Sequence, residues 1–403
     1  MSWSIFEGLA DLSCGGLLVV AESSRDPDLA AFVGDAHLGK SFLVLPLSSV
    51  GRLGYLTEME REEAAATGLS LLDSSLLEVE RARARHGFSA GFWSSVLRRG
   101  LEASGLEPTT MAVGGRLAAG ISHGALSALE DEGWRFIDGR VLLLRYRKRK
   151  SGRQAEAARR AASGVCAAMT RAAAILAATV ERNETLHWEG EPLSAGRLRR
   201  EISVSLASGG LDQPEGNIVA AGAAAGVPHT KGSDERILES GETIVIDLFP
   251  KGELFADLTR TFVLGEPSAT VDEAHRQVVD AVERAHREAR VGRCCWELQQ
   301  LTCDAFSRAG FATPISHPGT TQGYVHGLGH GVGFELHEYP SFAQNAGDEG
   351  ILELGDVFTL EPGLYDADAG YGVRLEDLCL VTETGIENLT PLPYEMNPRR
   401  WFR

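Results

Sequence analysis

Apolar runs and helical spacings alternate over the first part of the chain. Short apolar runs of the kind that form buried strands occur at residues 16–21, 41–46, 109–115 and 140–146. Around them, the spacing of apolar positions predicts helices at about residues 55–68, 89–104 and 121–132. Strands that alternate with helices are typical of a small α/β domain, and we expect one over residues 1–150.

The pattern changes after residue 150. Residues 152–180 are rich in Ala and Arg and contain no Pro, which predicts one long helix. A second helix is expected to begin after Ser194, whose side chain suits a helix N-terminus. Strands and loops are expected at 216–265, helices at about 270–290 and 296–309, and strands again towards the end. Helices separated from strands in this way indicate an α+β domain over residues 151–403.

Composition and charge narrow the range of partners. The 403 residues suit two domains, and 43% hydrophobic with 24% charged residues is ordinary globular composition. A formal net charge of −17 argues against a nucleic-acid partner, because phosphate binding needs clustered cations. The one basic run is "RYRKRK" at residues 145–150. We interpret it as a solvated strand exit before a helix rather than as a nucleic-acid or membrane patch.

Cysteine spacing and the lengths of apolar runs bear on the cellular compartment of the protein. The six cysteines form no CxxC pair, which predicts free thiols in a reducing environment. The first residues show no basic segment followed by an apolar core, and no apolar run approaches the ~20 residues that span a bilayer. We therefore expect a cytoplasmic protein with no membrane partner.

Two acidic residues stand inside apolar, strand-like segments. Asp247 ends the apolar run in "ETIVIDLFP" (242–250), and Asp257 lies in "LFADLTRTFVLG" (254–265). The "KGE" turn between these segments suggests an antiparallel hairpin. A carboxylate in such surroundings is costly to bury unless it is paired or coordinates a cation. Two that face each other across a hairpin would repel and so require a positive group between them.

The C-terminal part repeats this pattern. Glu361 ends the apolar strand in "VFTLEPGLY", and Glu376 and Asp377 stand in the middle of the strand-like run 372–382. Strand alternation places Glu376 on the same face as Arg374 and Asp377 on the other face. Each acid alone suits a surface or ion-pair position. Together with the three histidines of "HGLGHGVGFELHE" (326–338), they indicate a metal site.

The types of ligand suggest the chemistry. One histidine with several carboxylates suits Mn²⁺, Co²⁺, Fe²⁺ or Zn²⁺, and a carboxylate can bridge two ions. Two such ions would activate a shared water and polarise a carbonyl, which is the chemistry of amide hydrolysis. A zincin site is excluded because "HEYPS" (337–341) lacks the second histidine of HExxH, and no nucleophile-elbow motif is present.

The ordered motifs resemble a known family. "VIDLF", "ADLTRTF", "HGLGHGVGFELHE", "LEPGLY" and "VRLED" are similar to the pita-bread metallopeptidases, which include aminopeptidase P, prolidase and methionine aminopeptidase. The resemblance implies an α+β pita-bread catalytic domain over residues 151–403. It also implies that residues 1–150 form the smaller, non-catalytic α/β domain of the aminopeptidase P, prolidase and creatinase branch.

The resemblance also implies roles for individual residues. Asp247 would chelate one of two divalent ions, His330 and Glu361 the other, and Asp257 and Glu376 would bridge both. Glu361 would also accept a proton during catalysis. Three further histidines would contact the peptide substrate and stabilise the tetrahedral intermediate: His229, His326 and His337. Arg374 would orient Glu376. Manganese is the first expectation for the metal, with Co, Zn or Fe as alternatives, and a homodimer is expected.

The activity implied is removal of an N-terminal residue that precedes proline. No Arg or Lys lies between His337 and Glu361, where prolidases carry an arginine that holds the C-terminal carboxylate of a dipeptide. This favours an Xaa-Pro aminopeptidase over the alternative, an Xaa-Pro dipeptidase (prolidase). A creatinase-like amidinohydrolase and a non-catalytic binding module rank lower, because such relatives lose metal ligands and all five are present here.

Overall fold

A computed structural model describes residues 4–47 and 49–402. The chain divides into two compact units, Met1–Arg147 and Lys148–Arg403. The sequence analysis placed this boundary after residue 150. All six cysteines are free thiols, as expected. None of the helices in the described part of the chain is long and apolar enough to cross a membrane.

The first unit is built on a six-stranded sheet. Its strand order is β4-β3-β2-β1-β5-β6, with β1 antiparallel to β2 and parallel to β5. The strands are β1 (Gly16–Ala21), β2 (Ser41–Pro46), β3 (Arg52–Tyr55), β4 (Ser70–Leu72), β5 (Thr110–Gly114) and β6 (Arg135–Asp138). The helices are α1 (Ile5–Asp11), α2 (Pro27–Val33), α3 (Arg61–Ala66), α4 (Val79–His86), α5 (Ala90–Ala103), α6 (Ala119–Glu130) and α7 (Arg140–Lys148). Both faces of the sheet are buried, since alternate residues of β1 belong to two different apolar clusters.

Two predictions for this part of the chain are wrong. The apolar run at 140–146 is helix α7 and not a strand, with Leu142 and Leu143 buried and Val141 exposed. A short apolar run does not distinguish a buried strand from a helix face. The basic run is not solvated, because Arg147, Lys148 and Lys150 are at most 7% exposed. The predicted helix at 55–68 is shorter, since a 3₁₀ turn precedes α3.

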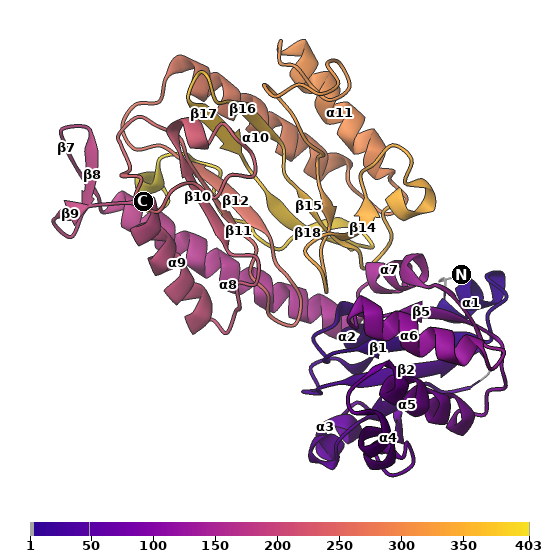
Figure 1. Cartoon of the computed structure of the whole chain (residues 1–403). Helices are drawn as coiled ribbons and strands as arrows, with labels where there is room; N and C mark the ends of the chain where they lie inside the picture. The colour runs from indigo at the N-terminus through magenta and orange to yellow at the C-terminus, as the bar shows by residue number, and fades with distance from the viewer. Residues whose placement is uncertain (1–3, 48, 403) are drawn as a thin grey trace. The chain divides into compact units, whose positions relative to one another are not determined.

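The second unit contains the four helices expected from the sequence. They are α8 (Gly152–Ala177), α9 (Ala195–Ser208), α10 (Ala269–Glu288) and α11 (Cys295–Arg308). Ser194 caps α9 as predicted, its hydroxyl accepting from the Arg197 backbone N–H at 3.1 Å. Helices α8 and α9 lie side by side, with α8 against β11 and β12 and α9 against β10 (Figure 1). Helix α10 packs on β15, β16 and β17, and α11 on β14.

The strands of this unit form a curved set of small sheets. The strands are β7 (Val180–Arg182), β8 (Thr185–Trp188), β9 (Glu191–Pro192), β10 (Asn217–Ala221), β11 (Ile244–Leu248), β12 (Leu258–Phe262), β13 (His330–Gly331), β14 (Glu338–Ser341), β15 (Val357–Leu360), β16 (Gly363–Asp366), β17 (Tyr371–Arg374), β18 (Asp377–Thr382) and β19 (Gly385–Asn388). The orders are β10-β11-β12, β14-β13-β15-β18-β19, β16-β17 and β7-β8-β9. The hairpin predicted from the acidic segments is the antiparallel pair β11–β12.

One predicted strand is interrupted. The run 372–382 divides into β17 and β18, with Leu375 and Glu376 between them. The Glu376 backbone N–H instead donates to the carbonyl of Thr259 in β12, at 3.0 Å. Because the strand is interrupted here, Glu376 lies against the neighbouring β11–β12 hairpin.

Candidate metal centre

Four carboxylates and one histidine from different sheets meet in the second unit. Asp247 lies in β11, Asp257 directly precedes β12, and Glu376 lies between β17 and β18. Glu361 directly follows β15, and His330 opens β13. The structure therefore brings together all five residues that the sequence analysis assigned as metal ligands.

The distances describe a compact group. One ligand atom from each of Asp257, His330 and Glu376 lies within 4.8 Å of the others. His330 Nε2 is 3.4 Å from Glu361 Oε1 and 3.7 Å from Asp257 Oδ2. Asp247 Oδ2 accepts from Arg374 Nη2 at 2.5 Å, and the Asp247 charge acts to raise the pKa values of the other three acids. Asp247 Oδ1 is buried and has no hydrogen-bond partner among the described residues.

The carboxylates oppose one another's ionisation. Burial, and then the charges of neighbouring acids, hold the pKa values of Asp257 and Glu376 well above their usual range. Burial and the nearby Asp247 raise the pKa of Glu361 to about 7, although Arg374 and Thr359 act in the other direction. Such a cluster requires added positive charge to stay fully ionised.

His330 has the form that a metal ligand needs. Burial lowers its pKa to about 3, with a smaller effect from His337, so the ring is neutral. Nδ1 lies 3.2 Å from the Gly331 carbonyl, which accepts its hydrogen, and this leaves the Nε2 lone pair facing the acids. The unpartnered Asp247 Oδ1, the crowded carboxylates and this imidazole together fit divalent cations with oxygen and nitrogen ligands.

Glycines let the short strand β13 approach its neighbours. A Cβ on Gly329 would lie 2.0 Å from the Thr359 carbonyl oxygen, and one on Gly331 would lie 2.0 Å from the Tyr339 carbonyl oxygen. The close approach is thus to the backbones on either side of His330. The His330 N–H also donates to Thr359 Oγ1 at 3.1 Å, which fixes the ligand strand against β15.

His337 and His229 lie beside this group. The ring centroids of His337 and His330 are 4.2 Å apart. Burial and then His229 lower the pKa of His337, while Glu215 and Asp247 raise it, so these three residues lie near its ring. Both His337 and His229 are exposed enough to meet a substrate.

His326 is in a different situation. Its Nδ1 lies 2.7 Å from the Gly327 carbonyl and its Nε2 lies 2.8 Å from the Tyr365 hydroxyl. Burial and then the Arg374 charge lower its pKa to about 3, so the ring is neutral. Nδ1–H therefore donates to Gly327, and Nε2 accepts from Tyr365. Both ring nitrogens are engaged within the protein.

Arg374 holds Asp247 directly and reaches Glu376 through a threonine. Arg374 Nε donates to Thr259 Oγ1 at 3.1 Å, and that hydroxyl donates to Glu376 Oε2 at 2.7 Å. Arg374 Nη1 donates to the Tyr365 hydroxyl at 3.0 Å. Strand alternation predicted that Arg374 and Glu376 lie on the same face, but it did not predict the connection between them through Thr259. Thr259 and Tyr365 were missed, because nothing in a lone Thr or Tyr shows which distant group it will contact.

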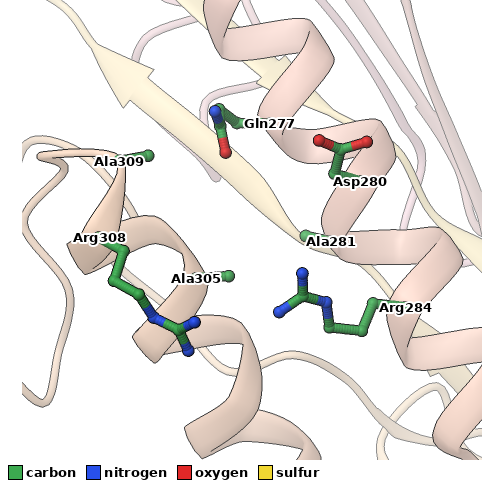
Figure 2. A pocket seen from close by; sticks show the side chains of 7 residues that line it. All are labelled: Gln277, Asp280, Ala281, Arg284, Ala305, Arg308 and Ala309. Atoms are coloured by element: carbon green, nitrogen blue, oxygen red, sulfur yellow. The ribbon is translucent and has the colours of Figure 1, made fainter.

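A separate surface pocket lies between α10 and α11 (Figure 2). It is lined by Gln277, Asp280, Ala281, Arg284, Ala305, Arg308 and Ala309. None of these residues belongs to the carboxylate–histidine group or to the histidines beside it. The pocket is therefore distinct from the candidate metal centre.

Comparison with known proteins agrees with the site. Residues 156–383 match the model of metallopeptidase family M24, which is more than half of the chain. The second unit has the pita-bread fold, and this fold brings the carboxylate–histidine group together. The chain belongs to metallopeptidase family M24. The predicted family and fold class are confirmed.

The curated relatives match part of their length. The chain is 35% identical over 215 residues to the Xaa-Pro dipeptidase of Pyrococcus furiosus, which covers 51% of this chain and 57% of that protein. It is 31% identical over 197 residues to the Xaa-Pro dipeptidase of Lactobacillus helveticus, covering 49% and 50%. The chain thus matches these relatives over about half their length.

Solved structures match over nearly the whole chain. The prolidase from Pyrococcus horikoshii superposes with a TM-score of 0.72 at 22% identity, covering 97% of this chain and 98% of that one. The X-Pro aminopeptidase from Thermotoga maritima gives a TM-score of 0.71 at 21% identity, with the same coverage. At this level of identity the likeness shows the fold, and both kinds of peptidase share it.

Proposed function

We propose that this chain is a metal-dependent peptidase that hydrolyses Xaa-Pro dipeptides. The observation that carries the proposal is the neutral His330 Nε2, which faces buried carboxylates. The same group includes Asp247, whose buried Oδ1 has no hydrogen-bond partner among the described residues. The similarity to curated Xaa-Pro dipeptidases supports the choice of substrate. That similarity favours the alternative in our sequence analysis over the aminopeptidase.

The residues have the following roles in this proposal. Asp247, Asp257, His330, Glu361 and Glu376 would hold two divalent ions, with manganese our first expectation. When bound, these ions would supply a water of lowered pKa and polarise the scissile carbonyl. Glu361 is the proton acceptor in this proposal, since its Oε1 lies 3.4 Å from His330 Nε2 and the bound ions would keep its carboxylate ionised. His337 and His229 face the peptide and hydrogen-bond to its carbonyl as negative charge develops there.

A dipeptide also presents a carboxylate close to the scissile bond, and this requires a cation. Lys231 lies two residues after His229 and is exposed. Its Nζ donates to the Glu215 carbonyl at 3.3 Å, and Glu215 is one of the groups that act on the pKa of His337. We assign Lys231 as the cation that meets the substrate carboxylate.

The aminopeptidase remains the second candidate because of one observation. The stretch between His337 and Glu361 contains no Arg or Lys, so no cation of that segment meets a dipeptide carboxylate. An enzyme that takes longer peptides has no need of such a cation. Length of substrate is therefore the property that distinguishes the two activities.

One set of assays tests both. The protein is purified without chelator, its bound metal is measured, and Ala-Pro is compared with Ala-Pro-Ala after Mn²⁺ is restored. We expect Ala-Pro to be cleaved much faster than the tripeptide. Faster cleavage of the tripeptide would establish the aminopeptidase, and no cleavage of either by metal-loaded protein would contradict both.

Blocking the carboxylate tests the assignment of Lys231. In the wild type, Ala-Pro amide should be a poorer substrate than Ala-Pro, because it lacks the negative charge. Lys231→Gln should raise KM for Ala-Pro by about two- to fivefold, the cost of an exposed ion pair, and leave the amide unchanged. An equal effect on both substrates would show that Lys231 does not bind the carboxylate.

A further inference from the structure

The buried end of the basic run forms an ion pair beside the metal centre. Lys150 Nζ lies 2.6 Å from Glu338 Oε1, and both side chains are 0% exposed. Lys150 Nζ also donates to the Lys148 carbonyl at 3.0 Å. An ammonium and a carboxylate removed from water in this way are stable only while each retains the other. Glu338 directly follows His337 in the chain.

The turn that leads to His337 rests on this pair. A Cβ on Gly333 would lie 2.1 Å from Glu338 Oε1 and 2.7 Å from Lys150 Cε, so the Gly333 backbone lies directly against both side chains. The Gly333 N–H donates to the Glu335 carbonyl at 3.0 Å. The Glu335 N–H in turn donates to Glu338 Oε2 at 3.4 Å. One carboxylate oxygen therefore binds Lys150 while the other holds the turn.

The same turn is tied to the ligand strands. Glu338 is paired with Gly331, and Ser341 with His330, where β14 meets β13. The Gly333 carbonyl accepts from the Phe255 N–H at 2.8 Å, two residues before Asp257. A shift of the turn would therefore move the His337 ring relative to the metal centre.

We propose that Lys150 and Glu338 are a positioning pair that holds His337 over the metal centre. Neither residue is one of the candidate ligands, and both act through the turn 333–338. The proposal rests on the proposed function in one respect, which is that His337 contacts the peptide. It adds a role for Lys150, a residue far from the histidine motif in sequence.

Lys148 provides a matched control. It belongs to the same run and is 2% exposed. Its Nζ lies 3.1 Å from Glu353 Oε2 and 3.6 Å from Asp356 Oδ2, and it donates to the Ile351 carbonyl at 2.6 Å. These partners lie outside the turn 333–338. Loss of Lys148 therefore removes a comparable buried ion pair without releasing His337.

A double-mutant cycle separates positioning from general stability. Lys150→Met should lower kcat/KM about 10- to 100-fold in the wild-type background, because a small misplacement of a substrate-contacting group has effects of that size. In the His337→Ala background the same change should lower kcat/KM by less than about twofold, since the residue that it positions is already absent. Lys148→Met should have the same effect in both backgrounds. An effect of Lys150→Met that persists undiminished in His337→Ala would overturn the proposal.

Milder variants and a spectroscopic measurement complete the test. Lys150→Arg retains the charge and should restore part of kcat/KM, and Glu338→Gln replaces Lys150→Met in the cycle if that variant fails to fold. Cycles are measured with whichever peptide the wild type cleaves, so an error in the Xaa-Pro assignment leaves them valid. NMR of histidine-labelled protein, with the His337 signal assigned from His337→Ala, gives a readout independent of activity. That signal should shift in Lys150→Met and stay in place in Lys148→Met; an unshifted signal in both would also overturn the proposal.

Discussion

Removal of one carboxylate should abolish activity and yet stabilise the metal-free protein. Asp257 is 4% exposed, and its ligand oxygen lies within 4.8 Å of the Glu376 ligand oxygen. Two unit charges at that separation repel by about 3.5 kcal/mol at an effective dielectric constant of about 20. Asp257→Asn retains the shape of the side chain and removes this repulsion together with the cost of burying a charge.

The predicted rise in melting temperature follows from that energy. In a unit of this size, about 1 kcal/mol corresponds to roughly 2–4 °C, so the upper limit is a rise of about 14 °C in chelator at pH 8. Partial protonation of the acids makes the observed rise smaller. With saturating Mn²⁺ the order should reverse, because a ligand at about 1,000 times its Kd stabilises the wild type by about 4 kcal/mol and the variant binds it poorly.

Calorimetry of both proteins, with EDTA and with Mn²⁺, measures all four states. Glu283→Gln is the control, since Glu283 lies on the exposed face of α10 and its loss removes one charge and only an exposed ion pair with Arg287. The reasoning would be refuted if Asp257→Asn melted below the wild type in EDTA, or if it retained turnover with metal restored.

Three further predictions concern the same centre. In the metal-free protein the raised pKa values of Asp257 and Glu376 mean that the folded state holds protons that the unfolded chain releases. These two carboxyls therefore make stability fall as pH rises from about 4 towards their raised folded-state pKa values, while the lowered pKa values of His326 and His330 act in the opposite direction below about 6.5. Thermal melts from pH 5 to 9 should show a flatter profile with Mn²⁺. Gly331→Ala should separate β13 from β14, because its Cβ would lie 2.0 Å from the Tyr339 carbonyl oxygen, and the variant should lose the bound metal measured by atomic absorption. The control variant Gly152→Ala, with open space at its Cβ, should bind metal normally. Thr259→Val removes the donor to Glu376 Oε2, and competition titration with a chelating dye should show metal affinity reduced about 10- to 100-fold; unchanged affinity would mean that Arg374 and Glu376 need no link.

Local signals in the sequence predicted most of the elements. Ser194 caps α9 as expected, and the Ala-rich segment forms α8, because helix propensity and capping depend on neighbours in the chain. The apolar run that became α7 failed because four apolar residues suit either a strand or a helix face. Its actual conformation depends on the packing of Leu142 and Leu143 in the core of the first unit.

Distant partners account for the remaining differences. The basic run was interpreted as a solvated strand exit because it follows an apolar run, yet Lys150 pairs with Glu338, 188 positions further on. The five ligand residues were found because they occur in ordered motifs that resemble a family. Thr259 and Tyr365 lie within the motifs "ADLTRTF" and "LEPGLY", but their roles appear only when β12, β16 and β17 are placed together.

The wide separation of the ligands along the chain also bears on how the protein folds. The bond from Arg374 to Asp247 joins positions 127 residues apart, and the group takes its members from strands of two sheets and from the connections between strands. Contacts of this kind form late, since long loops must close before they contribute. No short fragment holds the complete ligand set. The time at which tight metal binding appears during refolding would therefore report when the second unit completes its assembly.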